Sequence, residues 1–329
     1  MQRVSLIPFI VGLIGYDQCV RDSPELWKYG PEYNFHLQVY GRLSIKPTHD
    51  VESNISAIMQ CRPFTTNSAS SNNALRCHID NAEVDNYETN KSSLPPEIMR
   101  PMPPEPFEIT GFTFDIVFGM DRINEIRIHQ EIKNFRMNMY RDILSQLDIA
   151  FDRFAQTNQR FSARDYARSP VGECDTKLEK FRRFKSPKTE WDSPCKQLRL
   201  EVTGTNYPLV LIDKTRNMNN CTKKTPYFFG RENVASTAPS ITAEIISSVS
   251  GIMIAPQNFE SRTTRTGTLT LHTTDQKTSY PVTEEISLLL TSIEPASTPF
   301  EPLEVYGRTG VLADEPIITS TNHLHRPSE

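Results

Sequence analysis

The chain has 329 residues, of which 37% are hydrophobic, 24 are proline and only 13 are glycine. Nucleotide-binding α/β folds use glycine in their phosphate-binding turns, so this composition argues against such a fold. Lysine and arginine total 36 against 40 aspartate and glutamate residues, a net charge of −4, which argues against a globally basic nucleic-acid-binding protein. No apolar run reaches the length of about 18 residues that a transmembrane helix needs, and we expect no membrane span.

The N-terminus has the features of a secretory signal peptide. Arg3 precedes a mainly apolar run over residues 4–14, and Leu13-Ile14-Gly15 offers a cleavage site. A basic residue followed by an apolar run at the start of a chain is typical of secretion signals, and a buried N-terminal strand is the alternative. We therefore expect a signal peptide at 1–15 and a secreted, extracellular protein.

Cysteines and glycosylation motifs agree with secretion. The six cysteines are Cys19, Cys61, Cys77, Cys174, Cys195 and Cys221. None has the close spacing of a metal site, and an even number in an oxidising compartment favours disulfides while leaving the pairing open. Asn-X-Ser/Thr motifs begin at Asn54, Asn90 and Asn220. The sequence thus predicts a disulfide-bonded glycoprotein.

The first part of the chain reads as β-structure. Residues 27–45 alternate, with Tyr33, Phe35, Leu37 and Val39 on one face of a half-buried strand. Further strands are expected at 54–61, 75–84, 112–118 and 123–128, the last two forming a hairpin. The six prolines of 94–106 cannot donate ladder hydrogen bonds, which predicts a sheet edge or a rigid crossing there.

One segment has helical periodicity. Over residues 132–147, Phe135, Met139, Ile143 and Leu147 recur at every fourth position, which predicts an amphipathic helix whose apolar stripe packs in the core. We interpret the carboxylates of Asp148 and Asp152, just beyond it, as part of a solvated face.

A basic segment follows within the polar region 152–196. Its cations are Lys177, Lys180, Arg182, Arg183, Lys185 and Lys188. Phe181 and Phe184 lie among them, and cations interleaved with aromatic rings suit nucleic acid or a sulfated glycan. A solvated strand or loop is the alternative for 177–188.

The β pattern returns in the last third of the chain. Strands are expected at 198–202, 207–212, 227–229, 242–254, 269–273 and 286–293. Residues 294–329 have five prolines and no period, which predicts a disordered tail or linker. The whole pattern predicts a mainly β, antiparallel fold with one helix.

The order of these segments resembles the N-terminal domain of insect vitellogenins, members of the large lipid transfer protein family. The resemblance covers residues 24–293. The matching segments are Trp27–Tyr33 (WKYGPEY), Pro106–Ile109 (PFEI), the hairpin and helix of 114–147, Gly172–Cys174 (GEC) and Leu211–Cys221.

The resemblance implies a domain at 16–293 that forms an antiparallel β-barrel wrapped around one amphipathic helix. It also implies a role in lipid and yolk transport. In the family, the region matching 209–224 is proposed to bind a yolk receptor of the LDL-receptor family, whose modules present acidic groups around calcium. The matching cations are Lys214 and Arg216, and Lys223 and Lys224 follow them.

The same resemblance implies a disulfide between Cys174 and Cys221. Cys61 and Cys77 are a plausible second pair, which leaves Cys19 and Cys195 either paired or with one thiol free.

No catalytic constellation is recognisable. The chain lacks G-x-S-x-G, H-E-x-x-H and Walker motifs, and two histidines at 323 and 325 do not make a zinc site. We therefore expect no enzyme, no metal and no cofactor, and lipid only in the context of a longer chain. The alternative function is a secreted polyanion-binding or immune recognition protein that uses the basic segment 177–188, with anionic glycans among its possible ligands.

Overall fold

The structure is a computed structural model. It describes residues 25, 28–46, 49–65, 73–90, 97–98, 103–119, 122–128, 132, 134–149, 160–185, 207–224, 228–229, 241–255, 258–272, 276–299 and 308–310. The signal peptide expected at 1–15 lies outside these residues, as do Cys19, Cys195 and the strand expected at 198–202.

The described part is mainly β-strand with one α-helix. The strands are β1 (Pro31–Lys46), β2 (His49–Thr65), β3 (Asn73–Asn90), β4 (Glu97–Ile98), β5 (Glu105–Pro106), β6 (Phe114–Phe118), β7 (Ile123–Ile128), β8 (Arg160–Ser169), β9 (Gly172–Lys185), β10 (Tyr207–Thr222), β11 (Ile241–Ala255), β12 (Asn258–His272), β13 (Lys277–Pro295) and β14 (Arg308–Gly310). The helix α2 (Asn134–Leu144) continues into a 3-10 turn, η1 (Ser145–Leu147).

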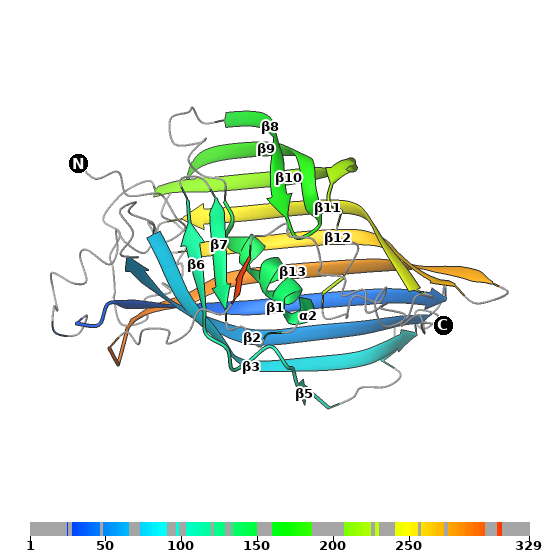
Figure 1. The fold of residues 1–329 in the computed structure, drawn as a ribbon, viewed down its shortest axis with the longest axis horizontal. Coiled ribbons are helices and arrows are strands. Elements are labelled where there is room, and N and C mark those ends of the chain that lie inside the picture. The colour runs from blue at the N-terminus through cyan, green and yellow to red at the C-terminus, as the bar shows by residue number, and fades with distance from the viewer. Residues whose placement is uncertain are drawn as a thin grey trace, which may run out of the picture.

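All the strands belong to one antiparallel sheet with β1 near its middle. Its order is β14-β7-β6-β3-β2-β1-β13-β12-β11-β10-β9-β8, with β4 and β5 paired to β3. Two runs of neighbouring strands, β1–β3 and β8–β13, meet where β13 returns to pair with β1. Figure 1 shows the long strands side by side as a broad curved sheet, with α2 in front of its centre.

The closed barrel expected from the sequence is not confirmed, because the sheet is open over the described strands. One end is β14 beside β7, and the other is β8. A barrel needs a continuous ladder of backbone hydrogen bonds around its whole circumference. Here the two ends approach through side chains instead, where Arg122 next to β7 lies 3.2 Å from Asp165 of β8.

The core between the sheet and the helix matches the predicted apolar faces. Tyr33, Phe35, Leu37 and Val39 are all buried, which confirms the inward face of β1. On the helix, Met139, Ile143 and Leu147 are buried as expected, while the side chain of Phe135 lies outside the described part.

Tyr140 fixes the helix against the strands that precede it. Its ring packs edge-on against Phe114 of β6, with ring centroids 4.9 Å apart. Its hydroxyl donates a hydrogen bond of 2.9 Å to the carbonyl oxygen of Ile109. Ile109 ends the Pro106–Ile109 segment, so this segment holds the helix in place. Burial raises the pKa of Tyr140 well above its ordinary value.

Three regions differ from the sequence prediction. Residues 228–229 of the strand expected at 227–229 are not in a strand, and residue 227 lies outside the described part. The polar segment 152–196 contains β8 and β9, which form a hairpin. Every second residue of β8 is exposed, but the residues between them are only half-buried, so the apolar alternation that signals a strand is weak. Within the expected tail, β14 pairs with β7. The expectation for 94–106 is confirmed, since β4 and β5 are short edge pieces on β3.

Candidate functional site

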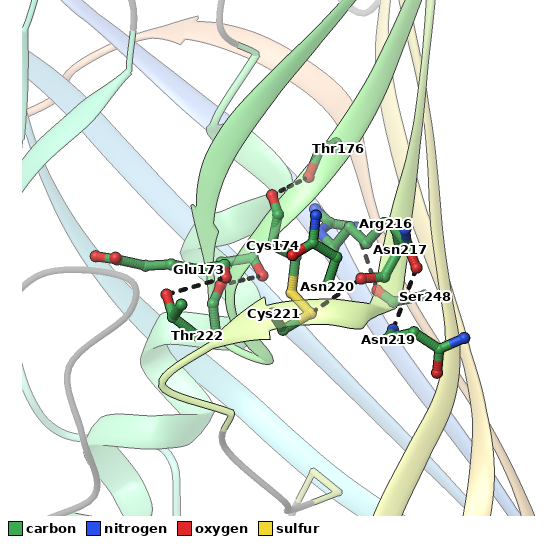
Figure 2. The surroundings of a disulfide bond; sticks show 12 residues. Glu173, Cys174, Thr176, Arg216, Asn217, Asn219, Asn220, Cys221, Thr222 and Ser248 are labelled. Carbon is green, nitrogen blue, oxygen red and sulfur yellow. Dashed lines mark hydrogen bonds between the residues drawn. A yellow bond between two sulfur atoms is a disulfide. The ribbon is translucent and has the colours of Figure 1, made fainter.

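The candidate site surrounds the disulfide between Cys174 and Cys221, which joins β9 to β10 (Figure 2). The second disulfide joins Cys61 of β2 to Cys77 of β3, where the two residues are direct partners in the ladder. Both pairs expected from the sequence are therefore bonded in the structure.

Gly172 explains why glycine precedes this disulfide in the Gly-x-Cys segment. The residue has φ +126°, a conformation that strongly favours glycine. A Cβ atom at this position would lie 2.8 Å from the carbonyl oxygen of Lys223 and 3.0 Å from that of Thr222. The turn between β8 and β9 thus packs directly on the end of β10, and only a residue without a side chain allows this approach.

Two of the four predicted receptor-contact cations are exposed beside this turn. Lys223 and Lys224 follow the last residue of β10, and both face solvent. The Lys223 ammonium lies 3.7 Å from the carboxylate of Glu173, which also accepts a hydrogen bond of 3.1 Å from Nε of Arg168. One carboxylate is therefore shared by two cations, which leaves the surface electropositive.

The other two predicted cations point to the inner face of the sheet. Lys214 is only 4% exposed, and its ammonium donates to the carbonyl oxygen of Asp148 and lies 3.7 Å from that residue's Oδ2. Because burial disfavours the charged form, the pKa of Lys214 is lowered to about 8. This residue supports the C-terminal end of the helical segment, where a cation is favourable.

Arg216 is half-buried, with its guanidinium turned inward. Its NH1 donates hydrogen bonds of 3.2 Å to Ser248 and 2.9 Å to Ser250, two buried hydroxyls on β11 (Figure 2 shows the first). Burial lowers the pKa of Arg216 to about 10. The side chains of Lys214 and Arg216 therefore turn toward the inside of the sheet, unlike those of Lys223 and Lys224, and the receptor-contact role expected for all four stays a prediction.

A polar network that sequence reasoning missed extends from these residues to the helix. Arg265 of β12 is buried and pairs with Asp142 at 2.9 Å and with Glu284. Burial raises the pKa of Glu284, while Arg265 acts in the opposite direction. Gln146 is also fully buried, and its Oε1 accepts hydrogen bonds from Ser261 at 3.0 Å and Thr263 at 3.1 Å.

Asp148 belongs to the same interior. Its Oδ1 accepts a hydrogen bond of 3.2 Å from the backbone N–H of Ile123, and the residue is buried. The interpretation of this carboxylate as part of a solvated face is wrong, because Asp148 is buried between Ile123 of β7 and Lys214 of β10. Asp152 lies outside the described residues.

A family model of the vitellogenin N-terminal domain matches residues 27–289. The chain belongs to this family. A solved structure described as lipid–protein interactions in lipovitellin matches with a TM-score of 0.56 at 12% identity. The match covers 88% of this chain and 28% of the lipovitellin chain, so it shows a shared fold over about a quarter of that protein. A search of curated proteins finds no match.

In this vitellogenin N-terminal domain, the basic segment 177–188 does not form one continuous cationic surface over its described side chains. Lys180 is buried, while Lys177 is exposed and pairs with Glu179 at 2.9 Å. A strand turns alternate residues to opposite faces, so neighbouring cations are separated. The side chains of 182–185 and all of residues 186–188 lie outside the described part. This arrangement gives no specific support to polyanion recognition.

The three glycosylation motifs lie on strands. Asn54 is half-buried in β2, Asn90 is the last residue of β3, and Asn220 is exposed near the end of β10. The Asn220 side-chain oxygen accepts a hydrogen bond of 2.6 Å from the hydroxyl of Tyr166. Glycosylation of these asparagines stays a prediction.

The described residues show neither a metal site nor a membrane-spanning helix. They contain no group of three or more His, Cys, Asp or Glu side chains placed to hold a metal ion. They also contain no helix with the length and hydropathy needed to cross a membrane.

Proposed function

We propose that this chain is the receptor-contacting N-terminal domain of a secreted, vitellogenin-like lipid carrier. The observation that carries the proposal is the family match over residues 27–289, together with a fold shared with lipovitellin. Lipid is bound in lipovitellin, and this chain spans 28% of the matched lipovitellin chain. We accordingly assign lipid carriage to a longer protein of which this domain is a part.

Secretion is supported by chemistry that suits an oxidising compartment. Two disulfides cross-link neighbouring strands of the sheet, one between β2 and β3 and the other between β9 and β10. Disulfides are rare in reducing compartments, so their presence agrees with the apparent signal peptide. Glycosylation at Asn54, Asn90 and Asn220 belongs to the same proposal.

Receptor contact is assigned to the exposed end of β10. Lys223 and Lys224 lie beside the Cys174–Cys221 bridge, which fixes their backbone relative to β9. The acidic, calcium-binding modules of an LDL-receptor-type receptor are the complementary partner. Lys214 and Arg216 act as positioning residues, because their hydrogen bonds hold β10 against the helix end and β11.

The proposal is tested by measuring binding of the full chain to calcium-loaded receptor modules by surface plasmon resonance. The test variant is Lys223→Glu/Lys224→Glu. The control, Arg262→Glu/Lys277→Glu, changes the charge equally at exposed positions on β12 and β13. We expect the test variant to lose affinity by about tenfold or more and the control by about twofold or less.

Two results would contradict the proposal. Equal losses in both double variants would mean that only overall charge matters. Unchanged binding of the Lys223→Glu/Lys224→Glu variant would remove these residues from the contact.

A further inference from the structure

A hollow lies at the seam where the two ends of the sheet face each other. It has a volume of about 330 Å³ and is lined by Arg122, Ile123, Asn124, Tyr166, Arg168 and Glu173. The first three residues lie at the start of β7, and the others lie on β8 and β9. The hollow therefore exists because side chains, rather than a backbone ladder, join these two ends of the described sheet.

The surface around this hollow carries more positive than negative charge. Arg122 and Arg168 line the hollow, and Lys223 lies 3.7 Å from its Glu173. Lys224 follows Lys223 in the chain, and Arg164 lies farther along β8. These cations face three carboxylates, those of Asp165, Glu173 and Asp175, with Arg122 paired to the first and Arg164 3.8 Å from the last. This excess stands out in a chain whose net charge is −4.

The outer face of β8 presents side chains suited to a protein partner. Arg164 is 75% exposed, Tyr166 51% and Arg168 55%, and they alternate along one face of the strand. The hydroxyl of Tyr166 is held by Asn220, which fixes the ring. Arginine and tyrosine are the residue types that contribute most at protein interfaces.

We propose that the hollow binds carboxylate side chains of an acidic protein segment lying across the outer face of β8. Arg168 and Arg122 supply the guanidinium donors, which match carboxylate geometry. For the identity of the partner, the proposal rests on the proposed function: the segment belongs to the acidic receptor modules, and the contact extends from Lys223 and Lys224 to the seam.

The acidic residues within the surface favour a protein over a dense polyanion. Glu173 lines the hollow, and Asp175 lies opposite Tyr166 on the face of the sheet that also carries Arg164 and Arg168. A sulfated glycan carries closely spaced charges and would place some of them against these carboxylates. An acidic protein segment has its carboxylates spaced by uncharged groups. Its carboxylates can therefore pair with the arginines without approaching the carboxylates of this surface.

The test measures binding of the oxidised full chain to a short synthetic peptide of alternating glutamate and serine residues by fluorescence anisotropy. Arg168→Glu is expected to weaken binding by about tenfold. The control Arg262→Glu alters an arginine of equal exposure, 55%, that is also paired with glutamates, and is expected to change binding by about twofold or less.

A second variant has the opposite expected sign. Glu173→Gln removes the carboxylate shared by Arg168 and Lys223 and frees both cations. We expect it to strengthen peptide binding by about threefold, with higher salt weakening the binding of every variant. Because misfolding does not raise affinity, this gain separates a binding role from a structural one.

Three results would overturn the proposal. They are equal effects of Arg168→Glu and Arg262→Glu, no gain from Glu173→Gln, and Arg168-dependent binding of a heparin oligosaccharide without binding of the peptide.

Repeating the series with receptor modules separates the two proposals. If Lys223→Glu/Lys224→Glu weakens module binding and Arg168→Glu does not, only the seam site fails. If the peptide behaves as expected and the modules do not bind, only the receptor assignment fails.

Discussion

Strand β10 carries two pairs of cations that occupy opposite environments. Lys214 and Arg216 lie where β10 pairs with both β9 and β11, and their side chains enter the interior. After Arg216 the pairing with β11 ends and the register with β9 shifts before Cys221. Lys223 and Lys224 lie beyond this break and are exposed. Proximity in sequence is therefore a poor guide to which cations a partner can reach.

The two environments also differ in charge balance. On the inner face of the sheet, the cations have buried polar partners. Arg265, for example, pairs with Asp142 and Glu284. Outside, Arg168 and Lys223 share Glu173, and their pairing is exposed to solvent. Inner cations should therefore contribute to folding stability, whereas outer cations should contribute to binding.

The largest expected effect comes from removing an inner cation. Arg265→Met leaves Asp142 and Glu284 buried without their cation, which should lower the free energy of unfolding by about 3–5 kcal/mol. The control Arg262→Met, on the same strand but exposed, should cost less than about 1 kcal/mol. Urea denaturation measures both, and similar losses would contradict the distinction between the two faces.

Removing disulfides tests what holds the outer cations in place. Cys174→Ser/Cys221→Ser opens a link with a sequence separation of 47, for which we expect a loss of about 2–4 kcal/mol of unfolding free energy and weaker binding to receptor modules. Cys61→Ser/Cys77→Ser is the control, with a separation of 16. It should also destabilise the chain but leave module binding unchanged when measured on the folded fraction. Equal losses of binding would show that the Cys174–Cys221 link does not position the lysines.

The sequence predicts the apolar part of this fold well and the polar interior poorly. The inward face of β1 and the stripe on α2 follow clear periods of two and of about four, and both are buried. On β12, Ser261, Thr263 and Arg265 point inward while polar residues also occupy the outer face. With polar residues on both faces, no period marks the inner one.

The candidate site divides in the same way. The family resemblance predicts the Cys174–Cys221 bond, which the structure contains. The inward orientation of Lys214 depends on the register of β10 with its neighbours, a long-range property that local spacing does not contain. The seam hollow joins β7 to β8 and β9 across the sheet, and no local motif signals it.

The titration of Lys214 should change the free energy of unfolding by less than the loss of Arg265 does. Its pKa is about 8 in the folded chain and 10.5 ordinarily, so between these values the unfolded chain binds more protons than the folded one. Stability contributed by this residue therefore rises with pH from about 8 to 10.5, by on the order of 1–3 kcal/mol. The measurement is the difference in unfolding free energy between the wild type and Lys214→Met across this range. A difference that does not change across this range would refute the inward assignment of Lys214.

The smallest expected change in stability, and the sharpest test of local geometry, comes from Gly172. Gly172→Ala and the control Gly111→Ala both place alanine at a positive φ, of +126° and +89°, which should cost about 1 kcal/mol or more in each case. Only at Gly172 would the added Cβ meet the backbone of Lys223, since nothing lies within 4 Å of the position at Gly111. Gly172→Ala should therefore displace Lys223 and weaken binding to receptor modules, while Gly111→Ala should not. Thermal unfolding and module binding, measured on the same samples, separate the two effects: equal binding by both variants would mean that the close packing of the β8–β9 turn on β10 does not position the outer lysines.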